Sequence, residues 1–180
     1  MRSHRLVNKT KVETILETER LRLRKITVDD AEFIHGLMNE PAYLEYIGDK
    51  GVRTVADAER FLQNVAIKSY QDNGFGHYIV ELKSDGTPMG TCGYVKRDEL
   101  EDPDIGFAFL PDFRKHGYAL ESAEAIKSFG IEVLGFTKIS AITTQHNERS
   151  GKLLDKLGFK FDRLISMPKG DELKLFTFST

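Results

Sequence analysis

The chain has 180 residues, of which 40% are hydrophobic and 30% charged, values that fit one globular domain with a packed core. Its 26 basic and 28 acidic residues leave a net charge of −2, which excludes a general electrostatic attraction to nucleic acid or to an anionic membrane surface. The single cysteine, Cys92, excludes an internal disulfide and a cysteine-based metal cluster, and no apolar run reaches membrane-spanning length, so we expect a cytoplasmic protein with no nucleic-acid or membrane partner.

The N-terminal third of the chain predicts a basic arm, one strand and two helices. Residues 1–17 are polar and basic without periodicity, so we expect a frayed arm there and a single domain over residues 18–180. Leucines that alternate with arginines over residues 20–25 indicate a strand with one solvated face. Apolar residues at three- and four-residue steps then predict helices over 28–38 and 54–70.

The rest of the chain alternates between strands and helices. Residues 77–82 and 89–95 predict a hairpin, and the glycines over 86–93 lack the lysine and the following helix of a nucleotide loop. The remaining elements are a strand over 104–110, a helix over 118–133, a strand over 138–144, a helix over 147–157 and a terminal hairpin over 159–165 and 173–178. This order predicts a mixed α/β (α+β) domain with about four helices, a sheet antiparallel at both ends and a right-handed crossover.

Positive charge is concentrated where the strand ending near residue 110 leads into the next helix. Arg114, Lys115 and His116 precede Gly117, and the helix begins directly behind that glycine. A helix N-terminus presents unpaired N–H groups and the positive end of the helix dipole. The junction is therefore expected to bind an anion, and phosphate is the anion that such sites most often hold.

Two motifs resemble those of a known family, the GCN5-related N-acetyltransferases (GNAT). Arg114-x-x-Gly117-x-Ala119 resembles the acyl-CoA pyrophosphate loop of that family. The segment Asn147-Glu148-Arg149-Ser150, followed by Leu157-Gly158-Phe159, is similar to one in the subgroup that includes the ribosomal-protein N-terminal acetyltransferases. The resemblance runs from about residue 18 to the C-terminus and includes the order of elements. It implies a mostly antiparallel central sheet that is splayed between its fourth and fifth strands.

The resemblance implies acetyl-CoA as the co-substrate. The pyrophosphate would lie on the basic loop and the helix start, and the pantetheine arm would pair with free backbone groups of the preceding strand. Asn147 would contact the cofactor or hold the splayed strand end, and a plain helix cap is compatible with both roles. The residues implied for the cofactor are Phe107, Ala108, Phe109, Leu110, Arg114, Lys115, His116, Gly117, Tyr118, Ala119, Asn147 and Ser150.

The family transfers acetyl directly from the thioester to an amine, which requires a base, an acid and an oxyanion donor. Asp104 is the candidate base because it starts the strand near a position where several members carry a glutamate, and Glu81 is the second candidate. Many members use a tyrosine as the acid where this chain has Leu154, so the expected acid is Ser150. The backbone N–H of Phe109 is the implied oxyanion donor.

The acceptor is left open between a protein N-terminal amine, a small amine and an amino acid. Tyr43 and Tyr46, in an expected loop or broken helix over 42–53, should hold it together with the first hairpin and the C-terminal strands. The acid-rich segment 98–104 hints at a cationic partner. The rival interpretation is a non-catalytic acyl-CoA-binding sensor or interaction module. No metal is expected, since the five histidines lack ligand spacing, and the chain is expected to be a monomer or homodimer.

Overall fold

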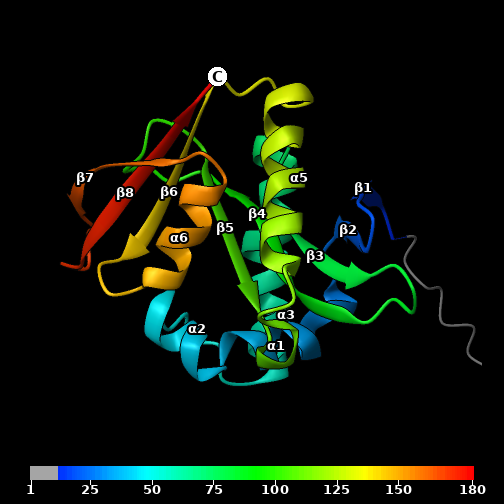
Figure 1. The fold of residues 1–180 in the computed structure, drawn as a ribbon. Helices are drawn as coiled ribbons and strands as arrows, with labels where there is room; N and C mark the ends of the chain where they lie inside the picture. Colours follow the sequence, from blue (N-terminus) through cyan, green and yellow to red (C-terminus); the bar gives the residue numbers. More distant parts are fainter. Residues whose placement is uncertain (1–11) are drawn as a thin grey trace, which may run out of the picture.

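The computed structural model describes residues 12–180 and contains one eight-stranded sheet with the strand order β1-β2-β3-β4-β5-β6-β8-β7 (Figure 1). The strands are β1 (Thr14–Glu17), β2 (Leu21–Lys25), β3 (His77–Leu82), β4 (Pro88–Val95), β5 (Asp104–Phe109), β6 (Lys138–Thr144), β7 (Lys160–Ser166) and β8 (Glu172–Ser179). All neighbouring strands are antiparallel except β5 and β6. The expected mixed, mostly antiparallel fold is therefore confirmed.

The helices are α1 (Ala31–Met38), α2 (Pro41–Tyr46), α3 (Val55–Phe61), α4 (Lys68–Asn73), α5 (Tyr118–Glu132) and α6 (Glu148–Lys156). A π-helical stretch, Leu62–Ile67, connects α3 to α4, so that helical structure runs from residue 55 to 73. Helix α2 occupies part of the expected loop or broken helix, because Pro41 fits a first helical turn and the Glu40 carboxylate accepts the Ala42 N–H. None of the helices within residues 12–180 is long and apolar enough to cross a bilayer.

The first strand corrects the expected boundary of the N-terminal arm. Residues 14–17 form β1 and pair antiparallel with β2, with Leu16 opposite Leu23. The expectation that the arm extends to residue 17 is thus wrong for these four residues, since pairing with β2 fixes their backbone. Residues 1–11 lie outside the described part of the chain.

Helices cover both faces of the sheet, and each face has its own hydrophobic cluster. Tyr94 of β4 packs in one cluster with Ile126 of α5, while Ile79 of β3 packs in the other with Ala58 of α3. Successive residues of a strand face opposite sides. Tyr78, the residue before Ile79, therefore packs in the cluster beneath α5. In Figure 1, α5 runs in front of the sheet and the helix that includes α3 lies behind it.

The sheet divides where β5 and β6 diverge. Their register contains a single partner pair, Asp104 and Ser140. By contrast, β4 pairs with β5 from Val95 and Asp104 to Gly90 and Phe109, and β6 pairs with β8 along its whole length. Beyond Asp104, the β6-facing edge of β5 has no strand partner among residues 12–180. This confirms the expected splay, since β5 and β6 are the fourth and fifth strands that the sequence predicts.

Candidate active site

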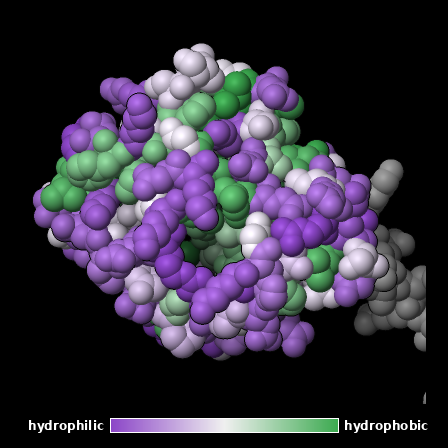
Figure 2. Space-filling view, viewed as in Figure 1, coloured by the Kyte–Doolittle hydropathy of each residue, from purple (hydrophilic) through white to green (hydrophobic). Residues whose placement is uncertain are grey.

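A cleft of about 1120 Å³ opens between the diverging strands. Its walls include residues 104–109 of β5 and 141–144 of β6, together with parts of α2, α6 and the π-helical stretch. Figure 2 shows a hollow near the middle of this face, with hydrophilic side chains around its rim and hydrophobic ones inside. The cleft is large, and its lining contains both polar and apolar side chains. It can therefore hold a long ligand with both polar and apolar parts.

The backbone of β5 offers donors toward the cleft at alternate residues. The N–H of Leu110 donates to the Met89 carbonyl at 2.9 Å, so the alternation of an antiparallel pair turns the N–H groups of Phe107 and Phe109 away from β4. Phe107, Ala108 and Phe109 line the cleft. Leu110 does not, and both its N–H and its carbonyl have backbone partners, so contact of Leu110 with the cofactor stays a prediction without support from its backbone.

The start of α5 has the features expected of an anion site. Gly117 is its N-cap residue with φ of 81°, and no side chain from the described residues caps the first turn. The N–H groups of Tyr118 and Ala119 therefore have no helical partner. Lys115 and His116 are exposed beside them. Of the basic loop and the first helical residues, only Arg114 and Ala119 line the cleft itself, so the anion site lies at its outer end.

Arg114 has a different role from the expected free cation. Its guanidinium donates to the Phe109 carbonyl through Nε at 3.1 Å and Nη2 at 2.9 Å, and Nη2 also lies 2.7 Å from Glu40 Oε2. The Glu40 carboxylate balances the charge, so Arg114 fixes the end of β5 and links it to the start of α2. Arg20, which the sequence did not single out, braces the loop by donating to the His116 carbonyl at 3.0 Å.

Asp104 is the buried carboxylate of the cleft. Its side chain accepts from Arg97 Nε at 2.7 Å through Oδ2, and the residue is 3% exposed. Burial raises the pKa of Asp104 to about 6, against the lowering effect of Arg97 and of the Ile142 backbone N–H. Oδ1 accepts no hydrogen bond of normal geometry from the described residues, the nearby Ile142 N–H included, and the buried Oγ1 atoms of Thr143 and Thr144 in the same cleft also lack a partner among them.

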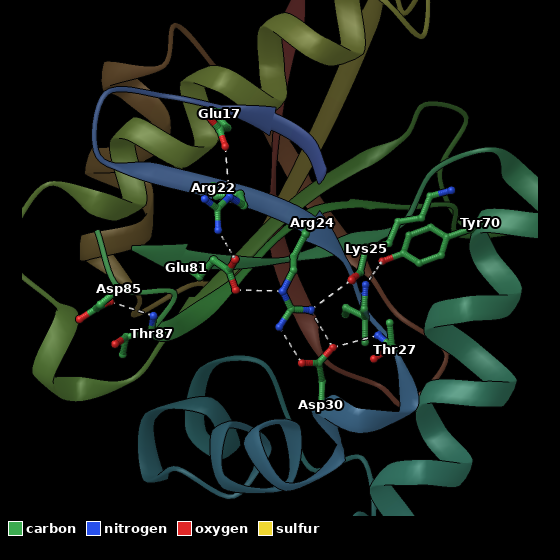
Figure 3. A network of polar contacts seen from close by, with 11 residues as sticks. Glu17, Arg22, Arg24, Lys25, Thr27, Asp30, Tyr70, Glu81, Asp85 and Thr87 are labelled. Atoms are coloured by element: carbon green, nitrogen blue, oxygen red, sulfur yellow. Dashed lines mark hydrogen bonds and ion pairs between the residues drawn. The ribbon is translucent and has the colours of Figure 1, made fainter. Parts of the chain in front are cut away.

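Glu81, the second candidate base, lies outside the cleft lining and is committed to ion pairs between β2 and β3. Figure 3 shows its carboxylate between Arg22, at 3.2 Å, and Arg24, at 2.9 Å. Arg24 also pairs with Asp30 at 2.8 Å. Burial lowers the pKa of Arg24, but its hydrogen bonds to Asp30 and Glu81 outweigh burial and raise it. Glu81 is therefore a poor base, and the expected solvated face of β2 is wrong at Arg24, whose side chain is 13% exposed.

Asn147 and Ser150 are held together at the start of α6. The Asn147 side chain caps the helix by accepting the Ser150 N–H at 3.2 Å. Both residues line the cleft, on the β6 side. The helix-cap role of Asn147 is thus confirmed, and contact of either residue with a cofactor stays a prediction.

His77 is a cleft residue that the sequence patterns did not single out. It lies opposite Gly93, which in turn lies opposite Gly106, and a Cβ at Gly106 would come within 3.2 Å of the His77 ring. The two glycines leave room for the imidazole on the sheet face that carries Asp104. Burial and the Arg97 charge lower the pKa of His77 to about 4, so the ring is neutral at pH 7. Paired glycines on neighbouring strands were the signal that could have revealed it.

The expected acceptor residues Tyr43 and Tyr46 both line the cleft. Burial raises the pKa of Tyr43 to about 12, although the Arg97 charge lowers it. Tyr46 packs on His146, with ring centroids 5.4 Å apart. Of the acid-rich segment 98–104, only Asp104 lines the cleft, so the hint of a cationic partner has no support from the rest of that segment.

A metal centre and a cysteine nucleophile would be two other kinds of reactive site. Within residues 12–180, no group of three or more His, Cys, Asp or Glu side chains is arranged to hold a metal ion. Cys92 is buried, and burial raises the pKa of its thiol to about 12. A thiolate nucleophile is therefore disfavoured. The buried carboxylate and the free backbone donors are thus the features of the cleft with the clearest chemical use.

Comparison with known proteins agrees with this geometry. A sequence model of the family described as "Acetyltransferase (GNAT) domain" matches residues 20–160. YoaA, an uncharacterized N-acetyltransferase of Bacillus subtilis (strain 168), is 31% identical over 152 residues, which are 84% of this chain and 85% of YoaA.

Two solved structures share the fold at lower identity. An acetyltransferase of Agrobacterium tumefaciens has a TM-score of 0.79 at 20% identity and covers 95% of this chain and 96% of its own. RimL, a ribosomal α-N-protein acetyltransferase solved in complex with coenzyme A, has a TM-score of 0.75 at 14% identity and covers 93% and 98%. With the family match over most of its length, the chain belongs to the GNAT family and is an acetyl-CoA-dependent N-acetyltransferase.

Proposed function

We propose that acetyl-CoA binds between β5 and β6 and that its acetyl group passes directly to a primary amine in a ternary complex. The single bridge pair between these strands carries the proposal, since it leaves the N–H groups of Phe107 and Phe109 for the amides of the pantetheine arm. The unpartnered oxygens of Asp104, Thr143 and Thr144 fit a polar ligand in the same cleft. RimL, which shares the fold, was solved with coenzyme A.

The pyrophosphate is proposed to lie at the N-terminus of α5. The first-turn N–H groups of Tyr118 and Ala119 point to an anion there, the exposed cation of Lys115 adds attraction, and the exposed ring of His116 can donate a hydrogen bond. Gly117 allows close backbone approach because it has no Cβ. Arg114 remains paired with Glu40, and this ion pair supports the loop.

Asp104 is the proposed base, acting through a water molecule at its free Oδ1. With a pKa of about 6 it is mostly ionised at pH 7.5 and still basic enough to accept a proton. Deprotonating a lysine-type amine at that pH costs about 4 kcal/mol, whereas an α-amine costs almost nothing. A base of this modest strength favours an α-amine as acceptor. The neutral ring of His77 lies beside Gly106, on the sheet face that carries Asp104, and is proposed to hold the same water.

The remaining roles follow from the two walls of the cleft. Ser150, in the first turn of α6, is the proposed acid that protonates the leaving thiolate. The N–H of Phe109, the expected oxyanion donor, lies roughly 16 Å of extended strand from Asp104, so in this proposal it pairs with the pantetheine arm and not with the oxyanion. Tyr43 and Tyr46 are proposed to contact the acceptor, because α2 carries both to the cleft lining.

The rival hypothesis is a non-catalytic acyl-CoA-binding sensor. It was based on the absence, at position 154, of the tyrosine that many family members use as the acid. Leu154 is 1% exposed and belongs to the main hydrophobic core, so it serves packing there. A buried carboxylate with one unpartnered oxygen is costly to fold around. A binding module gains nothing from this destabilising carboxylate, whereas an enzyme can use it as a base. The enzyme is therefore the better-supported hypothesis.

Release of free thiol from acetyl-CoA over a panel of amines tests this function. We expect Ser150→Ala to lower kcat at least about tenfold, while the alanine keeps the backbone N–H that Asn147 caps. Ser128→Ala, at an exposed position of α5 outside the cleft, is the matched control. Tight binding of acetyl-CoA with no thiol release on any amine or peptide N-terminus would instead support the sensor.

A further inference from the structure

The loop that leads into α5 has a strained backbone. Lys115 has φ of 65°, and it is the one non-glycine residue with a positive φ among residues 12–180. Gly117, two residues later, has φ of 81°. A side chain in the left-handed region costs conformational energy, and such a residue persists only where the surrounding structure fixes it. The loop therefore needs support from another part of the chain.

Arg20, just before β2, lies against this loop. Its Nη1 donates to the carbonyl of His116, the residue between Lys115 and Gly117, at 3.0 Å. A Cβ at Gly117 would come within 3.4 Å of Nη2, and the guanidinium carbon lies 4.5 Å from the centroid of the Tyr118 ring. One side chain therefore contacts the end of the loop and the first residue of α5.

Glu121, in the first turn of α5, holds Arg20 in this position. Its Oε2 accepts from Nε and Nη2 of Arg20, each at 2.7 Å. Its Oε1 accepts from the Arg20 backbone N–H at 3.0 Å and from Thr18 Oγ1 at 2.6 Å. Hydrogen bonds from two nitrogens of one guanidinium to the same carboxylate fix the orientation of both groups. The turn before β2 is thus joined to α5 and to its loop through one arginine.

The contacts of Arg20 give it a role at the loop rather than in the hydrophobic core. Its side chain is 42% exposed and that of Glu121 is 20% exposed, and an ion pair this accessible contributes little to global stability. All three guanidinium nitrogens have partners within the chain, and Glu121 balances the charge. Arg20 is therefore suited to orienting the loop backbone rather than to binding the phosphates itself.

We propose that Arg20 is a positioning residue for the cofactor: bound to Glu121, it holds the backbone of residues 115–117 in the conformation that binds the pyrophosphate. The inference rests on the proposed function and adds to it a residue outside the binding loop. A loop that is already fixed loses less conformational freedom when the ligand binds. Loss of Arg20 should therefore weaken the binding of acetyl-CoA and leave the transfer step unaltered.

Calorimetry with acetyl-CoA tests this role without requiring a known acceptor. Arg20→Ala should raise the Kd for acetyl-CoA at least about fivefold. Arg22→Ala is the matched control, because Arg22 has a similarly accessible side chain, 33% exposed, and pairs with Glu17 and Glu81 outside the loop. This control should leave the Kd unchanged. An unchanged Kd in Arg20→Ala, or an equal rise in both variants, would overturn the proposal.

Arg20→Lys separates orientation of the loop from charge. The lysine keeps a cation opposite Glu121, but one ammonium group does not reproduce the planar fork that binds a carbonyl and a carboxylate at once. We expect the Kd of this variant for acetyl-CoA to rise at least about threefold. Wild-type affinity in Arg20→Lys would show that charge alone acts, and the positioning role would then be wrong.

Kinetics and a loop variant complete the test. In thiol-release assays, Arg20→Ala should raise the KM for acetyl-CoA with kcat unchanged, whereas a lower kcat at unchanged KM would contradict a role in cofactor binding. If Gly117→Val weakens acetyl-CoA binding and Arg20→Ala does not, the pyrophosphate binds at the start of α5 but Arg20 does not position the loop. If neither variant changes the Kd, the proposed pyrophosphate site itself is wrong.

Discussion

Asp104 is a buried carboxylate whose two oxygens have different surroundings. Oδ2 accepts from Arg97 at 2.7 Å, and Oδ1 has no partner among the residues that the structure describes. Glu81, two strands away, is also buried, but Arg22 and Arg24 hold its carboxylate. Only a carboxylate with a free oxygen can take a proton from an incoming amine, so the difference in partners separates a base from a structural ion pair.

The raised pKa of Asp104 predicts the pH dependence of the enzyme. The base must be ionised, so kcat/KM should fall as pH falls through about 6, with a slope approaching tenfold per pH unit. Asp104→Asn should lower kcat at least tenfold and remove this limb of the profile. Folding raises the pKa of Asp104, so the protonated carboxyl favours the folded state. This contribution to the free energy of unfolding is fully present below the pKa of the unfolded chain and is lost as pH rises through about 6.

A nearby acid gives the control for this prediction. Asp102 lies in the same segment, pairs with Lys138 at 3.5 Å and does not line the cleft. Asp102→Asn should keep the wild-type pH profile, measured by thiol release at several pH values with saturating acetyl-CoA. A limb near pH 6 that survives in Asp104→Asn would assign the titration to another group.

Single residues were the hardest part of the site to predict from the sequence. Asp104 and Glu81 both follow from strand positions, yet choosing between them needs the register that brings Arg22 and Arg24 beside Glu81. Arg114 carries its charge in the expected place, but Glu40, 74 residues away, neutralises it. Long-range partners decide these roles, and local patterns do not contain them.

Helix α5 and the loop before it form the element that the sequence predicted best. Gly117 adopts φ of 81° at the N-cap, where a β-branched residue is strained and where a Cβ would lie 3.4 Å from Arg20 Nη2. Gly117→Val should therefore distort the first turn of α5. We expect the Kd for acetyl-CoA, measured by calorimetry, to rise at least tenfold, which is a loss of about 1.4 kcal/mol.

The other end of α5 supplies a control with the same backbone strain. Gly135 has φ of 75°, and a Cβ at this position would meet no atom of the described residues within 4 Å. Gly135→Val should cost similar folding free energy yet leave the affinity for acetyl-CoA unchanged. Equal affinity for acetyl-CoA in the two variants would show that the pyrophosphate does not bind at the start of α5.

Other elements show where sequence patterns stop. The terminal hairpin was predicted, but the insertion of β8 between β6 and β7 was not, because hairpin pairing does not say which strand meets the rest of the sheet. The splay came from family resemblance, since alternation along β5 and β6 does not specify whether two strands diverge. Strand β1 was missed because four residues are too few for a periodic signal.

At the scale of the whole molecule, the sheet consists of two parts joined by little backbone pairing. Strands β1 to β5 form one part and β6, β8 and β7 the other, and only Asp104 and Ser140 pair across the boundary within the described residues. A cofactor between β5 and β6 would add hydrogen bonds to both parts. Binding to the folded state alone adds about 2.7 kcal/mol of stability at a hundredfold excess over Kd.

Hydrogen exchange measured with and without coenzyme A tests this coupling. We expect slower exchange at the N–H groups of Phe107 and Phe109 and also within residues 141–144, because the ligand would cover both walls of the cleft. The N–H groups of the paired strands β1 and β2, which do not line the cleft, should exchange at the same rate in both samples and serve as the internal reference. Protection confined to β5 would mean that the cofactor lies along one strand without bridging the two parts, and the cleft between β5 and β6 would then not be its binding site.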